Sequence, residues 1–152
     1  MTAARAYAAR MARMDDAALR AFLTAGTRTG KLAVTRTDGS PHVVPIWFVV
    51  DDDGSVVFTT HAETIKGRAL RRDGRASLCV DDERPPFAYA RLDGRVAISE
   101  DPAELLAYAT RIGGRYMGAE RAEAFGRRNA AAGELLVRLV PEHVFSEDDI
   151  TG

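Results

Sequence analysis

The chain has 152 residues, 46% of them hydrophobic and 28% charged, which is the composition of one globular domain and excludes disordered or fibrous proteins. Its 21 basic and 22 acidic residues leave a formal net charge of −1, which disfavours a nucleic-acid-binding module. No apolar run approaches the roughly 20 residues of a membrane span. The single cysteine, Cys79, cannot form an internal disulfide, so we expect a reducing, cytoplasmic location.

Turn, cap and periodicity signals predict an alternation of strands with a few helices. In chain order these are a helix over 15–26, strands over 30–36, 42–50 and 55–60, a helix over 61–72, strands over 75–80 and 87–99, helices over 101–112 and 119–128, and a strand over 134–145. We expect residues 1–14 to be a flexible or helical extension, 15–148 to be a single domain, and 149–152 to be a tail.

Local signals refine this scheme. Asp38-Gly39 indicates a tight hairpin, so the first three strands are expected to form an antiparallel meander. Asp93-Gly94 indicates a bulge or turn within the fifth strand, and Gly113-Gly114 is expected to end the fourth helix. Six antiparallel strands with helices only at the crossings predict a mainly β (α+β) fold, a small closed or half-closed barrel with peripheral helices.

The junction between the third strand and the next helix carries the clearest chemical signal. The strand ends in Thr59 and Thr60, and the first turns of the helix carry Thr64, Lys66 and Arg68. Residues 61–75 contain five Lys or Arg and two acidic residues, a local charge of +3 in a neutral chain. Hydroxyl donors, a lysine and a helix N-terminus suit a phosphate, although a solvated basic helix face is the alternative.

Two further patterns are of chemical interest. Pro45 removes a ladder donor from a long apolar strand, as occurs at a barrel edge or where a ligand approaches the backbone, and Trp47 after it either stacks on a planar ring or packs in the core. Only two of the 21 basic residues are lysines, so each lysine departs from the preference of the chain for arginine.

No acid–base or metal-binding constellation is evident in the sequence. His42, His61 and His143 lack metal-ligand spacing, and Asp51–Gly54 is expected to be a hairpin tip rather than a calcium loop. A phosphate pocket without such machinery is typical of an enzyme whose cofactor carries the chemistry.

Several segments together resemble a known superfamily. They are residues 39–50, 58–60, 66–73, 75–86 and 115–118, and the resemblance extends over about 15–148. The chain resembles the pyridoxamine-phosphate-oxidase-like split-barrel superfamily and, within it, the flavin/deazaflavin oxidoreductases that use coenzyme F420. One departure is that residues 139–147 lack the Trp and Arg of genuine pyridoxamine-phosphate oxidases, which argues against oxidation of a B6 vitamer.

The resemblance implies a homodimer of six-stranded split barrels with two cofactor sites in the dimer cleft. The residues that match the cofactor-binding positions are Val44, Pro45, Ile46, Trp47, Thr59, Thr60, Thr64, Lys66, Gly67 and Arg68. It implies coenzyme F420, with FMN as the alternative, no metal, and hydride transfer to a small unsaturated molecule. Tyr116, His42 or solvent would supply the proton, and Arg68, Arg71 and Arg72 favour the anionic tail of F420.

Two alternatives to this function remain open from the sequence. One is an FMN-dependent reductase or oxidase on the same fold. The other is a non-catalytic protein that binds a flavin, a deazaflavin or haem.

Overall fold

The computed structural model of the chain describes residues 13–152, so the predicted extension over 1–14 lies almost wholly outside the described residues. The helices are α2 (Asp16–Thr24), α3 (Ile65–Asp73), α4 (Pro102–Met117), the 3-10 helix η1 (Ala119–Arg121) and α5 (Ala122–Asn129). The strands are β1 (Gly30–Thr35), β2 (Pro41–Ile46), β3 (Val49–Val50), β4 (Val56–His61), β5 (Arg75–Asp81), β6 (Tyr89–Ser99) and β7 (Glu134–Glu147).

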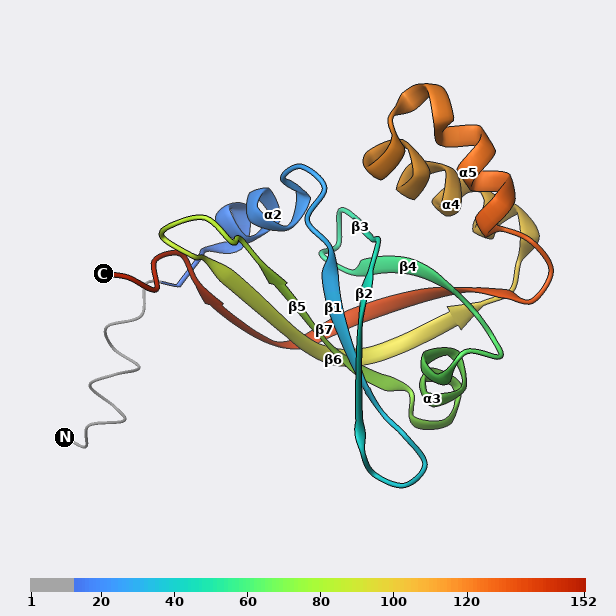
Figure 1. Ribbon diagram of the computed structural model, residues 1–152, viewed down its shortest axis with the longest axis horizontal. Coiled ribbons are helices and arrows are strands. Elements are labelled where there is room, and N and C mark those ends of the chain that lie inside the picture. Colours follow the sequence, from blue (N-terminus) through green and yellow to red (C-terminus); the bar gives the residue numbers. More distant parts are fainter. Residues whose placement is uncertain (1–12) are drawn as a thin grey trace.

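All of these strands belong to one antiparallel sheet with the order β2-β1-β5-β6-β7-β4-β3. The sheet curls into a half-barrel, in which the long β6 and β7 lie side by side and the β1–β2 hairpin projects away from them (Figure 1). The α4–α5 pair lies at one end, over β3, β4 and β7, and α3 lies below that end (Figure 1). The mainly β fold with peripheral helices is therefore confirmed.

The number of strands differs from the prediction, seven instead of six. The expected strand over 42–50 is broken at Trp47-Phe48, so that β2 pairs with β1 at one edge of the sheet while β3 pairs with β4 at the other. The expected three-stranded meander is therefore wrong. The backbone of Phe48 explains the break, because its N–H donates to the Tyr116 hydroxyl and its carbonyl accepts from Arg115.

The predicted end of the fourth helix is also wrong. α4 runs through Gly113-Gly114 to Met117 and ends at Gly118. A Cβ at position 113 would lie 2.8 Å from the Cβ of Phe125, so this glycine allows α4 and α5 to pack closely and does not end the helix.

Other local signals are confirmed. Asp15 and Asp101 cap α2 and α4 through their side chains, and Gly74 ends α3 in the left-handed conformation. The register of β6 against β7 shifts between Asp93 and Gly94, which is the predicted bulge.

Apolar side chains form two cores. The larger fills the barrel interior and includes Leu32, Phe48, Phe58, Leu78 and Leu139, all 2% exposed or less. The smaller lies between the outer face of β3, β4 and β7 and α4. None of the described helices lies on the outer face of β2, β1, β5 and β6 (Figure 1). Within residues 13–152, no helix is long and apolar enough to cross a membrane.

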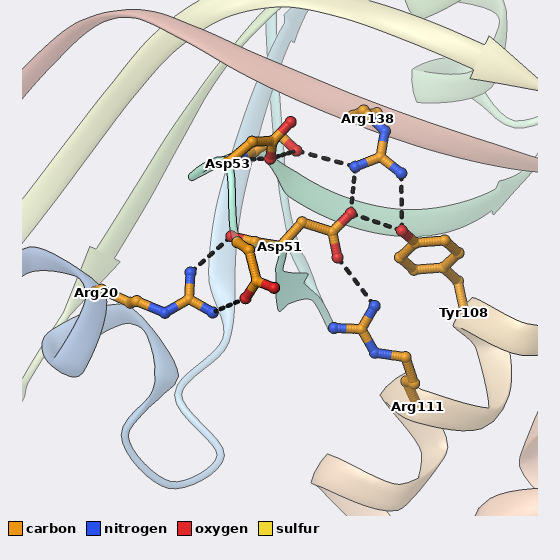
Figure 2. A network of polar contacts seen from close by, with 8 residues as sticks. Arg20, Asp51, Asp53, Tyr108, Arg111 and Arg138 are labelled. Atoms are coloured by element: carbon orange, nitrogen blue, oxygen red, sulfur yellow. Dashed lines mark hydrogen bonds and ion pairs between the residues drawn. The ribbon is translucent and has the colours of Figure 1, made fainter.

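A network around Asp51 joins α4 to the sheet (Figure 2). The carboxylate of Asp51, at the end of β3, accepts hydrogen bonds from Tyr108 at 2.6 Å, from Arg111 at 2.9 Å and from Arg138 of β7. Its backbone carbonyl accepts from Arg20 of α2 at 2.6 Å. One half-buried acid therefore holds α2, α4 and β7 to the β3–β4 turn.

Burial of Asp51 opposes its ionisation, but the hydrogen bonds from Arg138, Tyr108 and Arg111 outweigh it and lower the pKa to about 2. In the unfolded chain an aspartate titrates near ~3.9. The folded state therefore gains stability from ionised Asp51 above that value and loses it as pH falls toward ~2, about 2 kcal/mol in all.

We predict that Asp51→Asn lowers the free energy of unfolding at pH 7 by about 2–4 kcal/mol, because Arg138 loses its charged partner. Urea denaturation at pH 7 and at pH 3 measures this, and the variant should lose less stability than the wild type between those values. Asp52→Asn, whose side chain is exposed, is the control and should change stability by less than about 0.5 kcal/mol. If the free energy of unfolding changed equally between pH 7 and pH 3 in the wild type and in Asp51→Asn, the stabilising role of ionised Asp51 would be contradicted.

Candidate cofactor-binding site

The turn from β4 into α3 is built by side-chain hydroxyls. Thr64 caps α3, since its Oγ1 accepts from the Gly67 N–H at 3.0 Å and donates to the His61 carbonyl at 2.8 Å. The hydroxyl of Thr60 lies 3.1 Å from that of Thr64. Gly67 is required here because a Cβ at this position would overlap the His61 carbonyl oxygen. The structure thus brings Thr60, Thr64 and Gly67 together.

Positive charge accompanies these hydroxyls. Lys66 is half-buried in the first turn of α3, and among the described residues it has no ion-pair partner. The N–H groups of Ile65 and Lys66 precede the first intrahelical hydrogen bond, so they are donors at the positive end of the helix dipole. This turn has the donors and the charge that an anion requires.

Not every predicted residue faces this turn. Thr59 and Thr60 are successive residues of β4, so their side chains project from opposite faces of the sheet. The side chain of Thr59 therefore does not lie on the face that carries Thr60. Arg71 pairs with Glu100 at 2.7 Å, and Arg72 pairs with Asp73 at 2.9 Å, so both charges are compensated. Of the three arginines expected to favour an anionic tail, Arg68 alone is exposed without an ion pair in the described part of the chain.

An acidic residue borders the same turn. Glu134 begins β7 directly opposite His61. Burial raises the pKa of Glu134, while the charges of His61 and Lys66 act in the opposite direction. The Glu134 carboxyl is thus close enough to Lys66 to feel its charge, a neighbour that the sequence analysis missed.

The strand expected to run along a ring system is an edge of the sheet. In β2, Val44 pairs with Leu32 and Pro45 with Lys31, both of β1, while no other described strand pairs with the opposite side of β2. Ile46 points into the core and Pro45 is exposed. α3 packs against β1, the neighbour of β2, as well as against β4.

Trp47 packs on aromatic side chains of the α4–α5 pair. Its ring lies parallel to that of Tyr116, with the centroids 5.0 Å apart and an angle of 2°, and the Phe125 ring is tilted against it at 5.9 Å. The Tyr116 hydroxyl donates to the Arg28 carbonyl at 2.8 Å, and burial raises its pKa. His42, by contrast, is on the projecting hairpin, 3.3 Å from Arg36, so the structure does not bring it to Tyr116.

Arg115 fixes the strand break beside Trp47. Its guanidinium donates to the carbonyls of Leu23, Gly26 and Phe48 at 2.7–3.0 Å and lies over the Phe48 ring. The sequence analysis included Arg115 only as part of residues 115–118, a segment that resembles the superfamily, and assigned it no role. Its bonds are to backbone carbonyls distant in sequence, so no local pattern could have identified them.

No group of three or more His, Cys, Asp or Glu side chains suited to a metal occurs within residues 13–152.

Comparison with known proteins establishes the family. The family model of pyridoxamine 5'-phosphate oxidase matches residues 15–147, so the chain belongs to this split-barrel family. A search of curated proteins finds no match.

Solved structures share the fold. A conserved hypothetical protein from Mycobacterium tuberculosis superposes with a TM-score of 0.79 at 28% identity, over 91% of this chain and 88% of the other. An F420 reductase superposes with a TM-score of 0.68 at 24% identity, over 82% of this chain and 94% of the other. A heme storage protein from Vibrio cholerae superposes with a TM-score of 0.69 at 18% identity, over 88% of this chain and 95% of the other. At these identities the last two show a common fold, and the fold alone does not select the cofactor.

We predict that Arg115→Met lowers the free energy of unfolding by about 3 kcal/mol, because three backbone carbonyls, two of them in part-buried hydrogen bonds, lose a charged donor. Chemical denaturation followed by the fluorescence of Trp47, the single tryptophan, measures this loss. Arg121→Met is the matched control, since Arg121 is exposed and its guanidinium lies over the Phe125 ring. If both variants lost the same stability, Arg115 would not be the anchor of the strand break.

Proposed function

We propose that the protein is an oxidoreductase that binds coenzyme F420 and catalyses hydride transfer to a small unsaturated organic molecule. The observation that carries the proposal is the cluster of Thr60, Thr64 and Lys66 at the β4–α3 turn, where Lys66 is in no ion pair with another described residue. Such a turn suits a phosphate, and the edge strand β2 offers backbone groups to a ring system. The family and the fold of the F420 reductase support an oxidoreductase.

The residues present fit this cofactor by the chemistry of their donors. Lys66 and the first amides of α3 would hold the phosphate, with the hydroxyls of Thr60 and Thr64 ordering the turn and Gly67 leaving room for it. Val44 to Trp47 would run along the ring, and exposed Arg68 would face the anionic tail. Thr59 would stabilise the turn from the other face of β4. When bound, reduced F420 supplies a hydride.

The protein itself supplies binding, orientation and exclusion of water. The hydrogen-bonded β4–α3 turn and the strand break anchored by Arg115 would fix the two ends of the site. Fixing a donor carbon about 3–3.5 Å from an acceptor makes the transfer effectively intramolecular. FMN is the alternative cofactor, since it carries a phosphate but lacks the additional anionic tail.

We predict that Lys66→Ala weakens F420 binding by about 1.5–3 kcal/mol, roughly tenfold to a hundredfold in Kd, because a charged donor to the phosphate is lost. Paired titrations with F420 and FMN, followed by fluorescence, measure both affinities. Lys66→Arg is the control and should retain most of the affinity.

An unchanged Kd for Lys66→Ala would remove this turn from the cofactor site. Tighter binding of FMN than of F420 would favour the FMN-dependent alternative. A Soret band after purification with haem, together with no reductase activity, would favour a haem-binding protein instead.

We further propose that the protein is a homodimer with the cofactor site at the interface. Among the described residues, no helix covers the outer face of β2, β1, β5 and β6, and apolar Val43 of β2 is 59% exposed on that face. Exposed apolar side chains on an uncovered sheet are typical of an interaction surface.

Light scattering at micromolar concentration is therefore predicted to give twice the chain mass of 16.5 kDa. Val43→Glu should shift the mass toward that of the monomer, because a charge would be buried at the interface. The substitution Arg127→Glu on α5, away from this face, is the control. A wild-type monomer would contradict the dimer.

A further inference from the structure

A groove opens between α2, the β3–β4 turn and the inner face of β6 and β7. Its volume is about 480 Å³. α2 lies beside the end of the sheet where β6 begins and β7 finishes (Figure 1). None of the residues that line the groove belongs to the proposed cofactor site, so the proposed function does not use it.

The floor of the groove is apolar and continuous with the barrel core. Leu23, Val50 and Leu92 line it, and all three belong to the larger core and are 6% exposed or less. Val144 of β7 is the direct cross-strand partner of Leu92, so its side chain projects from the same inner face. Val144 is nevertheless 47% exposed. The described residues therefore leave an apolar part of the inner face open to solvent at this groove.

The rim of the groove is acidic. Asp16 of α2 and Asp52 and Asp53 of the β3–β4 turn carry three negative charges, against one positive charge on Arg20, so the net charge of the rim is −2. Arg20 pairs with Asp52 at 3.3 Å, which leaves Asp16 and Asp53 without an ion pair within residues 13–152. An acidic rim over an apolar floor favours an occupant that is both cationic and apolar.

The N-terminal segment, residues 1–12, has this composition. It contains Arg5 and Arg10 and no acidic residue. Tyr7, Met11 and six alanines supply apolar side chains. The charge of the segment is therefore opposite to that of the rim, and its other side chains suit the floor.

The chain enters the described fold next to this groove. The N–H of Met14 donates to the Ser146 hydroxyl at 3.1 Å. Ser146 lies two residues after Val144 in β7, on the same face and about 7 Å along the strand. The groove extends along β7 to Pro141, about 17 Å from Ser146. Twelve extended residues span about 40 Å, so the segment can reach every part of the groove.

We propose that residues 1–12 bind in this groove of their own chain, with apolar side chains on the floor and with Arg5 and Arg10 facing the acidic rim. Such binding would cover Val144 and close the open side of the barrel core. Because the segment is covalently attached beside the groove, its effective concentration there is on the order of millimolar, so weak contacts suffice. The proposal goes beyond the proposed function and depends on neither the cofactor nor the dimer.

Cleavage of the full chain by an arginine-specific protease tests the proposal. Cleavage after Arg5 and Arg10 requires the segment to leave the groove, and mass spectrometry measures the rate. When the segment leaves and returns quickly, this rate follows the population of the free segment, so about tenfold protection means that about nine-tenths is bound. We expect at least about tenfold protection relative to a synthetic peptide of residues 1–13. Equal rates in the chain and the peptide would overturn the proposal.

Val144→Lys and Val140→Lys form a matched pair of variants. Val140 is also 47% exposed, but it follows the inward-facing Leu139 in β7 and therefore lies on the outer face, outside the groove. Val144→Lys places a cation on the floor and should raise the cleavage rate about tenfold, whereas Val140→Lys should raise it less than about twofold. Equal effects of the two substitutions would contradict binding in this groove.

A substitution in the segment keeps the test valid if Val144→Lys does not fold. Tyr7→Asp lies outside the described residues and should raise the cleavage rate at least about fivefold, because it removes an apolar group and adds a negative charge. The charge of the rim is tested by Asp52→Lys, which should raise the rate about threefold. Glu83→Lys, the same change at an exposed acid outside the groove, is its control and should have no effect. An unchanged rate in Tyr7→Asp would refute the proposal.

A disulfide distinguishes the segment of the same chain from that of a second copy. In a Cys79→Ser background, Tyr7→Cys combined with Val144→Cys should form a disulfide that runs at single-chain mass on a non-reducing gel. Val140→Cys in place of Val144→Cys is the control and should remain reduced. Linked chains of double mass in a mixture of the Tyr7→Cys and Val144→Cys single variants would assign the groove to the segment of a second copy and overturn binding within one chain.

Discussion

The architecture depends on the break at Trp47-Phe48. Because Tyr116 and Arg115 bind the N–H and carbonyl of Phe48, the strand stops pairing and the chain passes from one edge of the sheet to the other. Trp47 and Phe48 therefore connect β2, at one edge of the curled sheet, to β3, at the other edge. The same break leaves β2 with one unpaired side, which is the backbone surface that the proposed cofactor site requires.

Local signals in the sequence predicted the elements well and their assembly less well. Caps such as Asp15, Asp101 and Gly74 act within one turn of chain, so the sequence reveals them. The break at Phe48 depends on a helix almost seventy residues later, and the role of Gly113 depends on Phe125. Interactions between distant residues leave no local pattern, which explains the wrong meander and helix end.

The candidate site shows the same division. The Thr60–Thr64 pair and the position of Lys66 follow from the strand-to-helix signal, and the structure places them together. The sequence could not show that Arg71 and Arg72 are compensated by Glu100 and Asp73. Nor could it show that the other lysine, Lys31, lies beside Pro45, because cross-strand register is set by the whole sheet.

The central claim is that the β4–α3 turn holds the phosphate of the cofactor. Titration of isotope-labelled protein with F420, followed by amide chemical shifts, tests it most directly. The account predicts the largest changes at residues 64–67, with smaller ones along β2. Changes confined to the α4–α5 pair or to the projecting hairpin, with residues 64–67 unaffected, would contradict it.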